Sequence, residues 1–297
     1  MEKDLFPGFE KRTITTKEGI TINFRIGGKG EPLLLLHGYP QTHVCWHKMA
    51  PYLSRSYTLI LPDLRGYGDS SKPHGKIDHS TYSKKEMAKD LFELMEFLEY
   101  RQYSILAHDR GARVAHRMAL DQPEQIKKLV LMDMLPTLLL FRHVNRAIAE
   151  GYYHWFFLIQ PDNLPENMIG ANPSYFIQEK LKRWSGKGLA SYDPAALKEY
   201  LRCSCKPEAI HAACEDYRAA ATIDLVHDQA DIHKKITSPL LVLWSKTGLM
   251  ETEFDVIKEW KEWALNVSGK AVENGKHFIP EEATQEILPI IIPWLQT

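Results

Sequence analysis

The segment Tyr103-Ser104-Ile105-Leu106-Ala107-His108-Asp109-Arg110-Gly111-Ala112-Arg113 leads from an apolar run into a helical pattern. It predicts a sharp turn between a buried strand and a helix, with Asp109 at the apex. The chain crosses itself closely at such a turn, and small residues, Ala107 and Gly111, stand two positions before and after the apex. A carboxylate there is ionised at neutral pH and can attack carbon without a base. Asp109 is therefore the predicted nucleophile; the alternative is an aspartate that caps the helix.

Buried strands are predicted wherever a continuous run rich in Leu, Val and Ile is bounded by turn residues. Helical patterns lie between these runs, for example at residues 83–99. This alternation favours an α/β fold with a mostly parallel sheet and helices on both faces. Residues 11–16 and 20–26 are predicted to form an antiparallel pair ahead of it. The apolar runs cover residues 32–36, 57–61, 103–107, 128–132, 240–244 and 269–273.

The alternation of strands and helices stops between residues 136 and 225, where helical stretches, aromatic residues and turns rich in Pro and Asn replace it. A segment of this length without a strand is too long to be a loop. We therefore expect a helical cap at residues 136–225. It is inserted into an α/β core that comprises residues 1–135 and 226–297.

Composition narrows the functions open to the chain. Of its 297 residues, 37 are Lys or Arg and 38 are Asp or Glu, so no overall basic field would attract nucleic acid or an anionic membrane. No secretion signal begins the sequence, and no run of roughly 18 apolar residues occurs. We expect a cytoplasmic protein that binds neither nucleic acid nor membranes, whereas a small anionic substrate stays open. Irregular spacing predicts reduced thiols and no zinc site for Cys45, Cys203, Cys205 and Cys214.

A histidine and an acid follow other predicted strands. His277 lies just beyond the last strand and ahead of the final helix, where a nucleophile, acid, histidine order places its base. Two acids could orient it: Asp133, after the run 128–132, and Glu251, after the run 240–244. We predict Asp133, because no acid directly follows residue 244 and the position of Asp133 is similar to that of the acid in several hydrolases that cleave haloalkanes or haloacids. The alternative for Asp133 is a capping role at the strand end.

Two further loops are typical of one kind of α/β fold, the α/β-hydrolase fold. His37-Gly38-Tyr39-Pro40 follows the run 32–36, where α/β-hydrolases place a turn of the oxyanion hole. We expect the backbone N–H groups of Tyr39 and Arg110 to form that hole. The segment Asp63-Leu64-Arg65-Gly66-Tyr67-Gly68-Asp69-Ser70 resembles another loop typical of the superfamily. Together with the Asp109 turn, these segments predict the α/β-hydrolase fold.

Arg110 and Arg113 flank Asp109 at the start of the predicted helix. Two guanidinium groups beside a helix N-terminus suit one carboxylate, and they also favour the ionised form of Asp109. We therefore predict that both bind the carboxylate of a small anionic substrate. The alternative is that Arg113 pairs with a structural acid while Arg110 reaches solvent.

Three hydrogen-bond donors lie in the predicted cap, namely His154, Trp155 and Tyr217. As a set they could hold a departing halide. Fluoride is a poor leaving group, so donors placed where its charge develops would help it most. The alternative is that these aromatic residues only build the interior of the cap.

At this point the chain resembles the fluoroacetate dehalogenases, a haloacetate dehalogenase family of α/β-hydrolases. The resemblance runs through the segments quoted above and through Glu215-Asp216-Tyr217-Arg218, and its specific part is the double-arginine turn combined with His154-Trp155. It implies no cofactor and commonly a homodimer. The implied roles are nucleophile for Asp109, base for His277, acid partner for Asp133, carboxylate binding for Arg110 and Arg113, and halide binding for His154, Trp155 and Tyr217.

The expected reaction is the hydrolysis of a short 2-haloacid, fluoroacetate above all, to the 2-hydroxyacid and halide. It would pass through an ester on Asp109, which water activated by His277 cleaves. Three alternatives stay open: an enzyme active only on chloroacetate and bromoacetate, an epoxide hydrolase, and a non-catalytic ligand-binding homologue. The arginine pair argues against the epoxide, because a neutral epoxide gives these charges nothing to bind.

Overall fold

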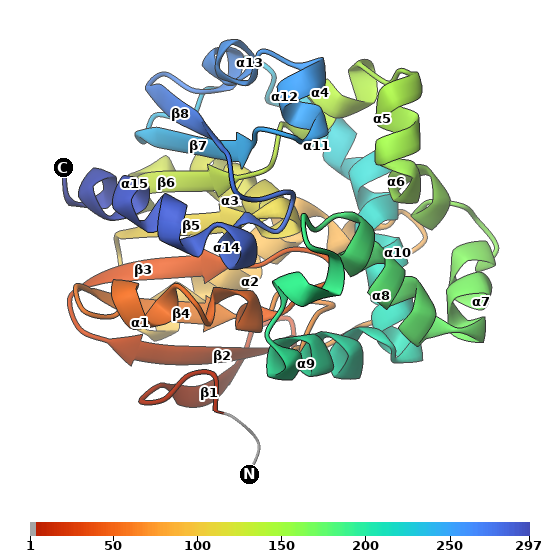
Figure 1. The fold of residues 1–297 in the computed structure, drawn as a ribbon, viewed down its shortest axis with the longest axis horizontal. Helices are drawn as coiled ribbons and strands as arrows, with labels where there is room; N and C mark the ends of the chain where they lie inside the picture. The colour runs from red at the N-terminus through yellow and green to blue at the C-terminus, as the bar shows by residue number, and fades with distance from the viewer. Residues whose placement is uncertain (1–3) are drawn as a thin grey trace.

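The computed structural model describes residues 4–297 as a sheet flanked by helices, with a further group of helices at one end of the strands (Figure 1). The strands are β1 (Glu10–Thr15), β2 (Thr21–Gly28), β3 (Glu31–Leu36), β4 (Tyr57–Pro62), β5 (Tyr103–His108), β6 (Ile126–Met132), β7 (Leu240–Ser245) and β8 (Val267–Val272). The helices of the core are α1 (Ala50–Leu53), α2 (Lys84–Phe97), α3 (Asp109–Asp121), α12 (Leu249–Glu253), α13 (Val256–Trp263), α14 (Ile279–Glu282) and α15 (Thr284–Gln296).

The eight strands form one sheet in the order β1-β2-β4-β3-β5-β6-β7-β8. β1 pairs antiparallel with β2, and β2 pairs antiparallel with β4. All remaining pairs, from β4 to β8, are parallel. The predicted mostly parallel sheet is therefore confirmed. Its two antiparallel strands lie together at one edge, as the sequence pattern indicated.

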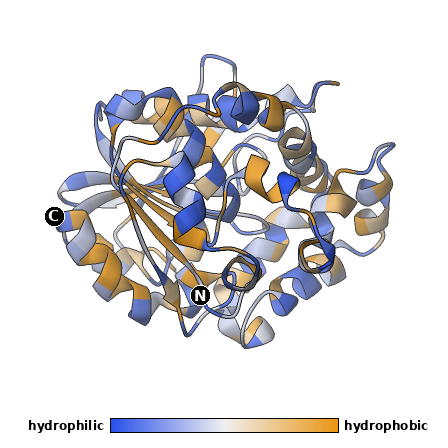
Figure 2. Cartoon of the chain, turned by 90° about the horizontal axis from the view of Figure 1, so that it is seen from above, coloured by the Kyte–Doolittle hydropathy of each residue, from blue (hydrophilic) through white to orange (hydrophobic). Residues whose placement is uncertain are grey.

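Helices cover both faces of the sheet. In Figure 1, α1 and α15 lie on one face, and α2 and α3 lie on the other. Every residue of β5 and β7 is buried, which is the reason their sequences are continuous apolar runs and do not alternate with polar residues. Figure 2 shows the same arrangement by hydropathy, with apolar strands at the centre of the core.

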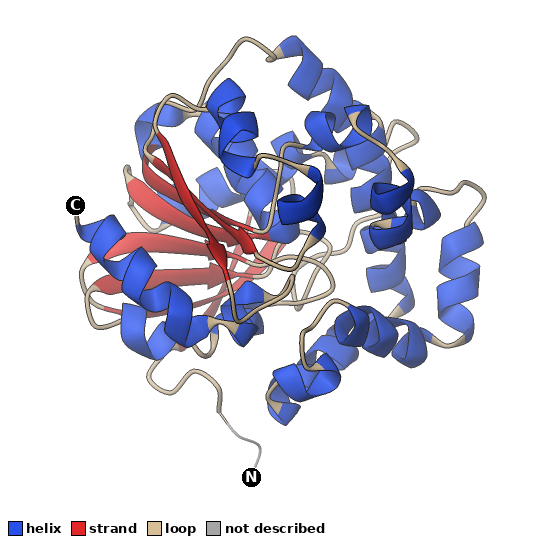
Figure 3. Ribbon diagram, turned by 45° about the horizontal axis from the view of Figure 1, so that its top comes forward, coloured by secondary structure: helices blue, strands red, loops and turns tan. Residues whose placement is uncertain are grey.

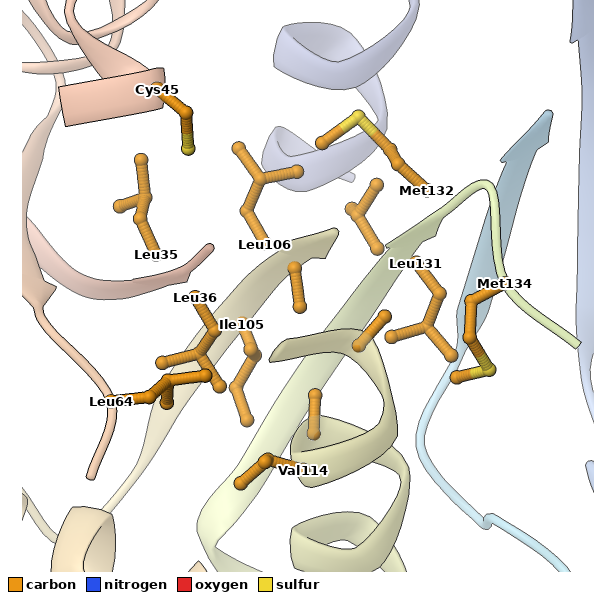
Figure 4. Close-up of a cluster of buried hydrophobic side chains, with 14 of the residues drawn as sticks. Leu35, Leu36, Cys45, Leu64, Ile105, Leu106, Val114, Leu131, Met132 and Met134 are labelled. Carbon is orange, nitrogen blue, oxygen red and sulfur yellow. The ribbon is translucent and has the colours of Figure 1, made fainter. Parts of the chain in front are cut away.

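Apolar side chains support the turn that carries Asp109 from below. Leu106 of β5, Leu131 of β6 and Val114 of α3 are fully buried and belong to one cluster (Figure 4). Each such side chain stabilises the fold by roughly 1.5–3 kcal/mol through burial. The strand and the helix on either side of Asp109 are therefore held firmly against each other.

A block of helices lies between β6 and β7, at the carboxyl ends of the parallel strands (Figure 3). Figure 1 shows the arrowheads of β3, β6 and β7 pointing toward it. The residue-225 boundary expected for the cap falls inside its last helix. Within residues 4–297, no helix combines the length and apolar character needed to cross a membrane. The block contains α4 (Thr137–Arg142), α5 (Arg146–Gly151), α6 (Tyr153–Leu158), α7 (Leu164–Ala171), α8 (Pro173–Arg183), α9 (Pro194–Ser204), α10 (Pro207–Ala221) and α11 (Ile223–Ala230).

Short 3₁₀ helices complete the structure. They are η1 (His43–Trp46), η2 (Ser80–Tyr82), η3 (Pro123–Gln125) and η4 (Gly188–Ser191). The first of them follows the predicted oxyanion turn, and Thr42 caps it by accepting a hydrogen bond from the Val44 backbone N–H. This cap fixes the chain just after Tyr39 and so steadies the loop next to Asp109.

Candidate active site

Asp109 sits at the apex of the predicted strand-to-helix turn, between β5 and α3, with a φ of +48°. A side chain in this region of φ is strained by about 1–3 kcal/mol, and such strain concentrates at functional sites. Two glycines make the close crossing possible. A Cβ on Gly111 would lie 2.3 Å from the His37 carbonyl oxygen, and one on Gly38 would lie 2.4 Å from the Asp109 Cβ. The turn therefore requires glycine at both positions.

The carboxylate of Asp109 is buried and lies between two donors. Its Oδ1 accepts a hydrogen bond of 2.8 Å from the Tyr39 backbone N–H, and its Oδ2 lies 3.5 Å from His277 Nε2. Burial alone would raise the pKa of Asp109, but hydrogen bonding to His277 and the positive charges nearby hold this pKa well below its ordinary value. Asp109 is therefore ionised at neutral pH, as a nucleophile must be.

His277 joins Asp109 to a second carboxylate. Its Nδ1 lies 2.6 Å from Asp133 Oδ2, and Asp133 Oδ1 accepts a hydrogen bond from the Ser245 backbone N–H at 3.1 Å. Asp133 directly follows β6 and, like Asp109, has a positive φ, of +47°. Burial lowers the pKa of His277, but its contacts with the carboxylates of Asp109 and Asp133 outweigh burial and raise that pKa to about 9. The three residues form a continuous acid, base, acid chain.

Glu251, the other acid considered for His277, points elsewhere. Its Oε2 accepts a hydrogen bond of 2.6 Å from the Trp244 indole N–H, and it pairs with Lys246. Hydrogen bonds from Lys246 and Trp244 lower the pKa of Glu251, so its carboxylate is already engaged by these two residues. The geometry thus brings Asp133, and not Glu251, to His277.

Arg110 is fully buried and pairs with a carboxylate of the cap. Its Nε donates to Asp216 Oδ2 at 2.9 Å, and its Nη2 donates to Asp216 Oδ1 at 2.7 Å and to the Asp216 carbonyl oxygen at 2.8 Å. Its Nη1 has no hydrogen-bond partner. Arg110 therefore does not reach solvent, contrary to the alternative considered above.

Arg113 is 5% exposed and has no carboxylate within 4 Å among residues 4–297. Its Nη1 donates to the Leu135 carbonyl oxygen and to Thr137 Oγ1, each at 2.9 Å, and its Nε is without a partner. Burial lowers the pKa of Arg113 to about 10, so it stays charged at neutral pH. The alternative in which Arg113 pairs with a structural acid is wrong. A buried cation without a counterion is costly, and it favours the entry of an anion.

The three predicted halide donors meet in space although they come from two cap helices. The Tyr217 ring lies 5.3 Å from the His154 ring and 5.7 Å from the Trp155 ring, measured between centroids. Neither ring nitrogen of His154 has a hydrogen-bond partner, and burial lowers its pKa well below the ordinary value, so the ring is neutral. The Arg110 guanidinium stacks 4.3 Å above the Tyr217 ring. These aromatic groups therefore cluster with Arg110 and with Arg113, whose guanidinium lies 4.5 Å from the Trp155 ring.

Sequence reasoning missed three residues of this cluster. Trp184 places its ring 4.5 Å from those of both His277 and His154. Lys180 is 2% exposed, lies 3.5 Å above the Trp184 ring and has no hydrogen-bond partner for Nζ. Asp216 holds Arg110. An acid next to Tyr217, on a helix rich in alanine, was a signal for Asp216, but the sequence holds no comparable signal for Lys180.

The arrangement places an ionised carboxylate beside a histidine, and Arg110, Arg113 and His154 each have a nitrogen without a protein partner. Within residues 4–297, no group of three or more His, Cys, Asp or Glu side chains could hold a metal ion. A carboxylate beside a histidine is an arrangement that nucleophilic catalysis with a general base can use.

A strained aspartate at a strand-to-helix turn, a histidine beyond the last strand and an acid after a neighbouring strand are together typical of one class of enzyme. The chain belongs to the α/β hydrolase fold family, whose model matches residues 31–284. It is therefore a hydrolase, and the predicted fold class is confirmed.

The resemblance to the fluoroacetate dehalogenases is confirmed as well. The chain is 42% identical to Fluoroacetate dehalogenase from Burkholderia sp, over 93% of its own length and 90% of that protein. It is also 31% identical to Soluble epoxide hydrolase from Corynebacterium sp. (strain C12), over 91% of its own length and 92% of that protein. A solved alpha/beta hydrolase structure from Nostoc sp PCC 7120 has a TM-score of 0.94 at 52% identity, covering 97% of this chain and 98% of that one.

Proposed function

We propose that this hydrolase removes halide from short 2-haloacids, with fluoroacetate as its best substrate and glycolate and fluoride as the products. The observation that carries the proposal is Arg113, a buried charged guanidinium without a counterion beside an ionised Asp109. A small carboxylate is the ligand that would balance this charge. The fluoroacetate dehalogenase relative supports the same substrate class.

In the first step an oxygen of Asp109 attacks the carbon that bears the halogen. A carbon–oxygen bond forms, the carbon–halogen bond breaks, and the halide leaves with the electron pair. The substrate carboxylate binds to Arg113 and to the unpartnered Nη1 of Arg110. We assign the halide to the donors around His154, because both of its ring nitrogens lack a protein partner. Donors aimed at a developing charge stabilise the transition state more than the substrate.

In the second step His277 takes a proton from water, and the hydroxide attacks the carboxyl carbon of Asp109. The backbone N–H groups of Tyr39 and Arg110 stabilise the oxyanion; the former already donates to Asp109 Oδ1. The intermediate collapses, the glycolate oxygen leaves and takes the proton from His277, and Asp109 loses its own proton to regenerate the carboxylate. One fluoroacetate and one water give glycolate, fluoride and a proton.

Formation of the ester on Asp109 lowers the pKa of His277 and so allows it to act as a base. Against the effect of burial, Asp109 and Asp133 together raise the pKa of His277 to about 9, which keeps the ring protonated before the substrate reacts. Esterification removes the charge of Asp109, so that only Asp133 still favours the protonated ring. The pKa of His277 then falls, and the histidine becomes a base at the step that needs one.

Epoxide hydrolysis is the second candidate, and the Corynebacterium relative favours it. The same Asp109 and His277 would serve, and a cap tyrosine such as Tyr217 would protonate the epoxide oxygen. A neutral epoxide would leave the charge of Arg113 unbalanced, however, which is why we place this reaction second. Activity restricted to chloroacetate and bromoacetate would keep the whole mechanism with a weaker halide site.

The test is an incubation of the purified protein with fluoroacetate and, separately, with chloroacetate, with release of each halide followed beside an Asp109→Asn control. Fluoride release over many turnovers, absent from the control, is the expected result. Chloride release alone would limit the reaction to weaker carbon–halogen bonds. Release of neither ion would contradict the proposal, and turnover of a panel of small epoxides would then identify the second candidate.

A further inference from the structure

We infer that Asp216, on cap helix α10, is a positioning residue that orients Arg110 so that one edge of its guanidinium group is kept for the substrate carboxylate. The inference rests on the proposed function, because it concerns the same anion site. Asp216 comes from the cap, whereas Arg110 is the second residue of α3 in the core. The pair therefore links the cap to the core at the proposed site of the substrate carboxylate.

One edge of the Arg110 guanidinium group has hydrogen-bond partners, and the other edge has none. A guanidinium group has five N–H bonds: one on Nε and two on each terminal nitrogen. Asp216 takes the Nε–H through Oδ2 and both Nη2 hydrogens through Oδ1 and its carbonyl oxygen, at 2.9, 2.7 and 2.8 Å. The two hydrogens of Nη1 are left, in a fully buried group without another acceptor. Asp216 thus determines which edge of Arg110 can meet a ligand.

Asp216 is itself fixed from two further directions. The Tyr67 hydroxyl donates to its Oδ2 at 2.5 Å, and Lys84 Nζ donates to its Oδ1. Asp224 balances Lys84, accepting from the Lys84 backbone N–H at 2.8 Å and lying 3.8 Å from its Nζ. Two carboxylates thus meet two cations in a buried cluster. A cluster with matched charges holds its shape without a ligand, and this gives Asp216 the rigidity that positioning requires.

Arg110 and Arg113 therefore contribute to anion binding in different ways. The charge of Arg110 is already balanced by Asp216, so Arg110 contributes direction more than net attraction. The charge of Arg113 has no counterion among residues 4–297, so Arg113 contributes the attraction. Tyr217, the neighbour of Asp216, stacks against the same guanidinium at 4.3 Å. The same cap helix, α10, therefore both packs against Arg110 and orients it.

The experiment compares Asp216→Asn with Asp224→Asn, which removes the same charge from the same cluster but does not contact Arg110. For each variant we would measure kcat and KM with fluoroacetate and the inhibition constants of acetate and bromide. Acetate reports the carboxylate site and bromide the halide site. Asp216→Asn should raise KM and the acetate constant about tenfold or more. The bromide constant should change much less, and Asp224→Asn should leave all three within about threefold.

Equal effects of the two substitutions on acetate binding would overturn the inference, because loss of cluster stability would then explain both. An Arg110→Lys background supplies a second criterion. There, Asp216→Asn should add almost nothing to the acetate constant, since the group it orients is gone. A full additional tenfold loss in that background would also contradict the inference.

Failure of the proposed function is recognised separately. If the wild-type protein releases no halide, acetate binding measured by calorimetry still compares the same variants. If Asp216→Asn does not fold, Tyr67→Phe removes one bond to Asp216 and keeps every charge. Tyr82→Phe is its matched control, because the buried Tyr82 hydroxyl donates to the Pro73 carbonyl oxygen instead. A roughly threefold rise in the acetate constant for Tyr67→Phe alone supports the inference, and no difference between the two overturns it.

Discussion

The two sides of the candidate site differ in how their polar groups are satisfied. On the side of the sheet, the carboxylates of Asp109 and Asp133 lie against His277 and accept backbone hydrogen bonds. On the side facing the cap, Arg113 Nε, Arg110 Nη1 and both ring nitrogens of His154 have no protein partner. On the sheet side, within residues 4–297, His277 Nε2 also has no hydrogen-bond partner, so the unpartnered nitrogens of the site lie mostly, though not entirely, toward the cap.

We interpret the sheet side as the part of the site that reacts and the cap-facing side as the part that binds the substrate. Buried polar groups without partners cost free energy, so the unpartnered nitrogens toward the cap are a feature that the fold must support in the absence of a ligand. A ligand that carries two anionic positions, a carboxylate and a developing halide, would satisfy them. The comparison therefore predicts that substitutions on the sheet side and on the cap side differ in their effects on stability as well as on activity.

The largest effect is expected on the sheet side. Asp109→Asn removes the anionic nucleophile and should reduce kcat/KM for fluoroacetate by at least about 10⁴-fold. Halide release measured over hours is the assay. Residual activity within about tenfold of the wild type, in a variant with an unchanged circular dichroism spectrum, would show that another group attacks the carbon.

The next largest effect on activity is expected for Arg113→Gln, on the cap-facing side of the site. Loss of the charge without a counterion should reduce kcat/KM by about 100-fold or more. Because this charge is unbalanced, the free energy of unfolding should fall by no more than about 1 kcal/mol. Kinetics and urea denaturation measure the two quantities.

The matched control is Arg117→Gln on the same helix. Arg117 is also buried but contacts Asp121 at 2.5 Å and Asp231 at 2.8 Å, so its loss should destabilise the fold by about 3 kcal/mol or more. The same loss of stability in both variants would remove the distinction drawn between these two arginines.

His154→Phe keeps an aromatic ring but removes both unpartnered nitrogens. If His154 helps to hold the departing halide, kcat/KM should fall about 10- to 100-fold with fluoroacetate and clearly less with bromoacetate, since bromide leaves more readily. Thermal unfolding should change little, because no hydrogen bond within the protein is lost. An equal loss with both substrates would assign His154 to packing of the cap.

The smallest effect is a dependence of stability on pH. The folded-state pKa of His277 is raised to about 9, above its ordinary value of 6.5, by Asp109 and Asp133 acting against burial. The stabilisation is therefore complete below pH 6.5 and is lost as the pH rises through about 9. The stability difference between wild type and His277→Asn should shrink by roughly 1–3 kcal/mol over this window. Urea denaturation at pH 6, 7.5 and 9 measures it, and a constant difference would contradict the protonated resting state.

Much of the fold could be predicted because its signals are local. A short apolar run bounded by turn residues, such as residues 103–107, is typical of a buried strand, and Gly111 marks the close crossing behind Asp109. The position of His277 and of its two candidate acids, Asp133 and Glu251, followed from where parallel strands end. These predictions needed no knowledge of which side chains meet across the cap.

The remainder depends on contacts between distant segments. Asp216 and Arg110 are 106 positions apart, and nothing near either residue indicates that they pair. For the same reason the sequence could not show that Arg110, rather than Arg113, pairs with an acid of the cap. The buried, unpartnered Lys180 likewise becomes visible only once α8 lies over the site. Hydrogen-bond satisfaction is a property of the assembled structure.

The central claim is that Asp109 becomes esterified by the substrate and that His277 is needed only afterwards. It is tested most directly by mass spectrometry of the His277→Asn variant after incubation with fluoroacetate, with digestion to locate any added group. The account predicts one carboxymethyl group per chain, on the peptide that contains Asp109, and one fluoride released per site. Fluoride release without an adduct on that peptide would contradict it.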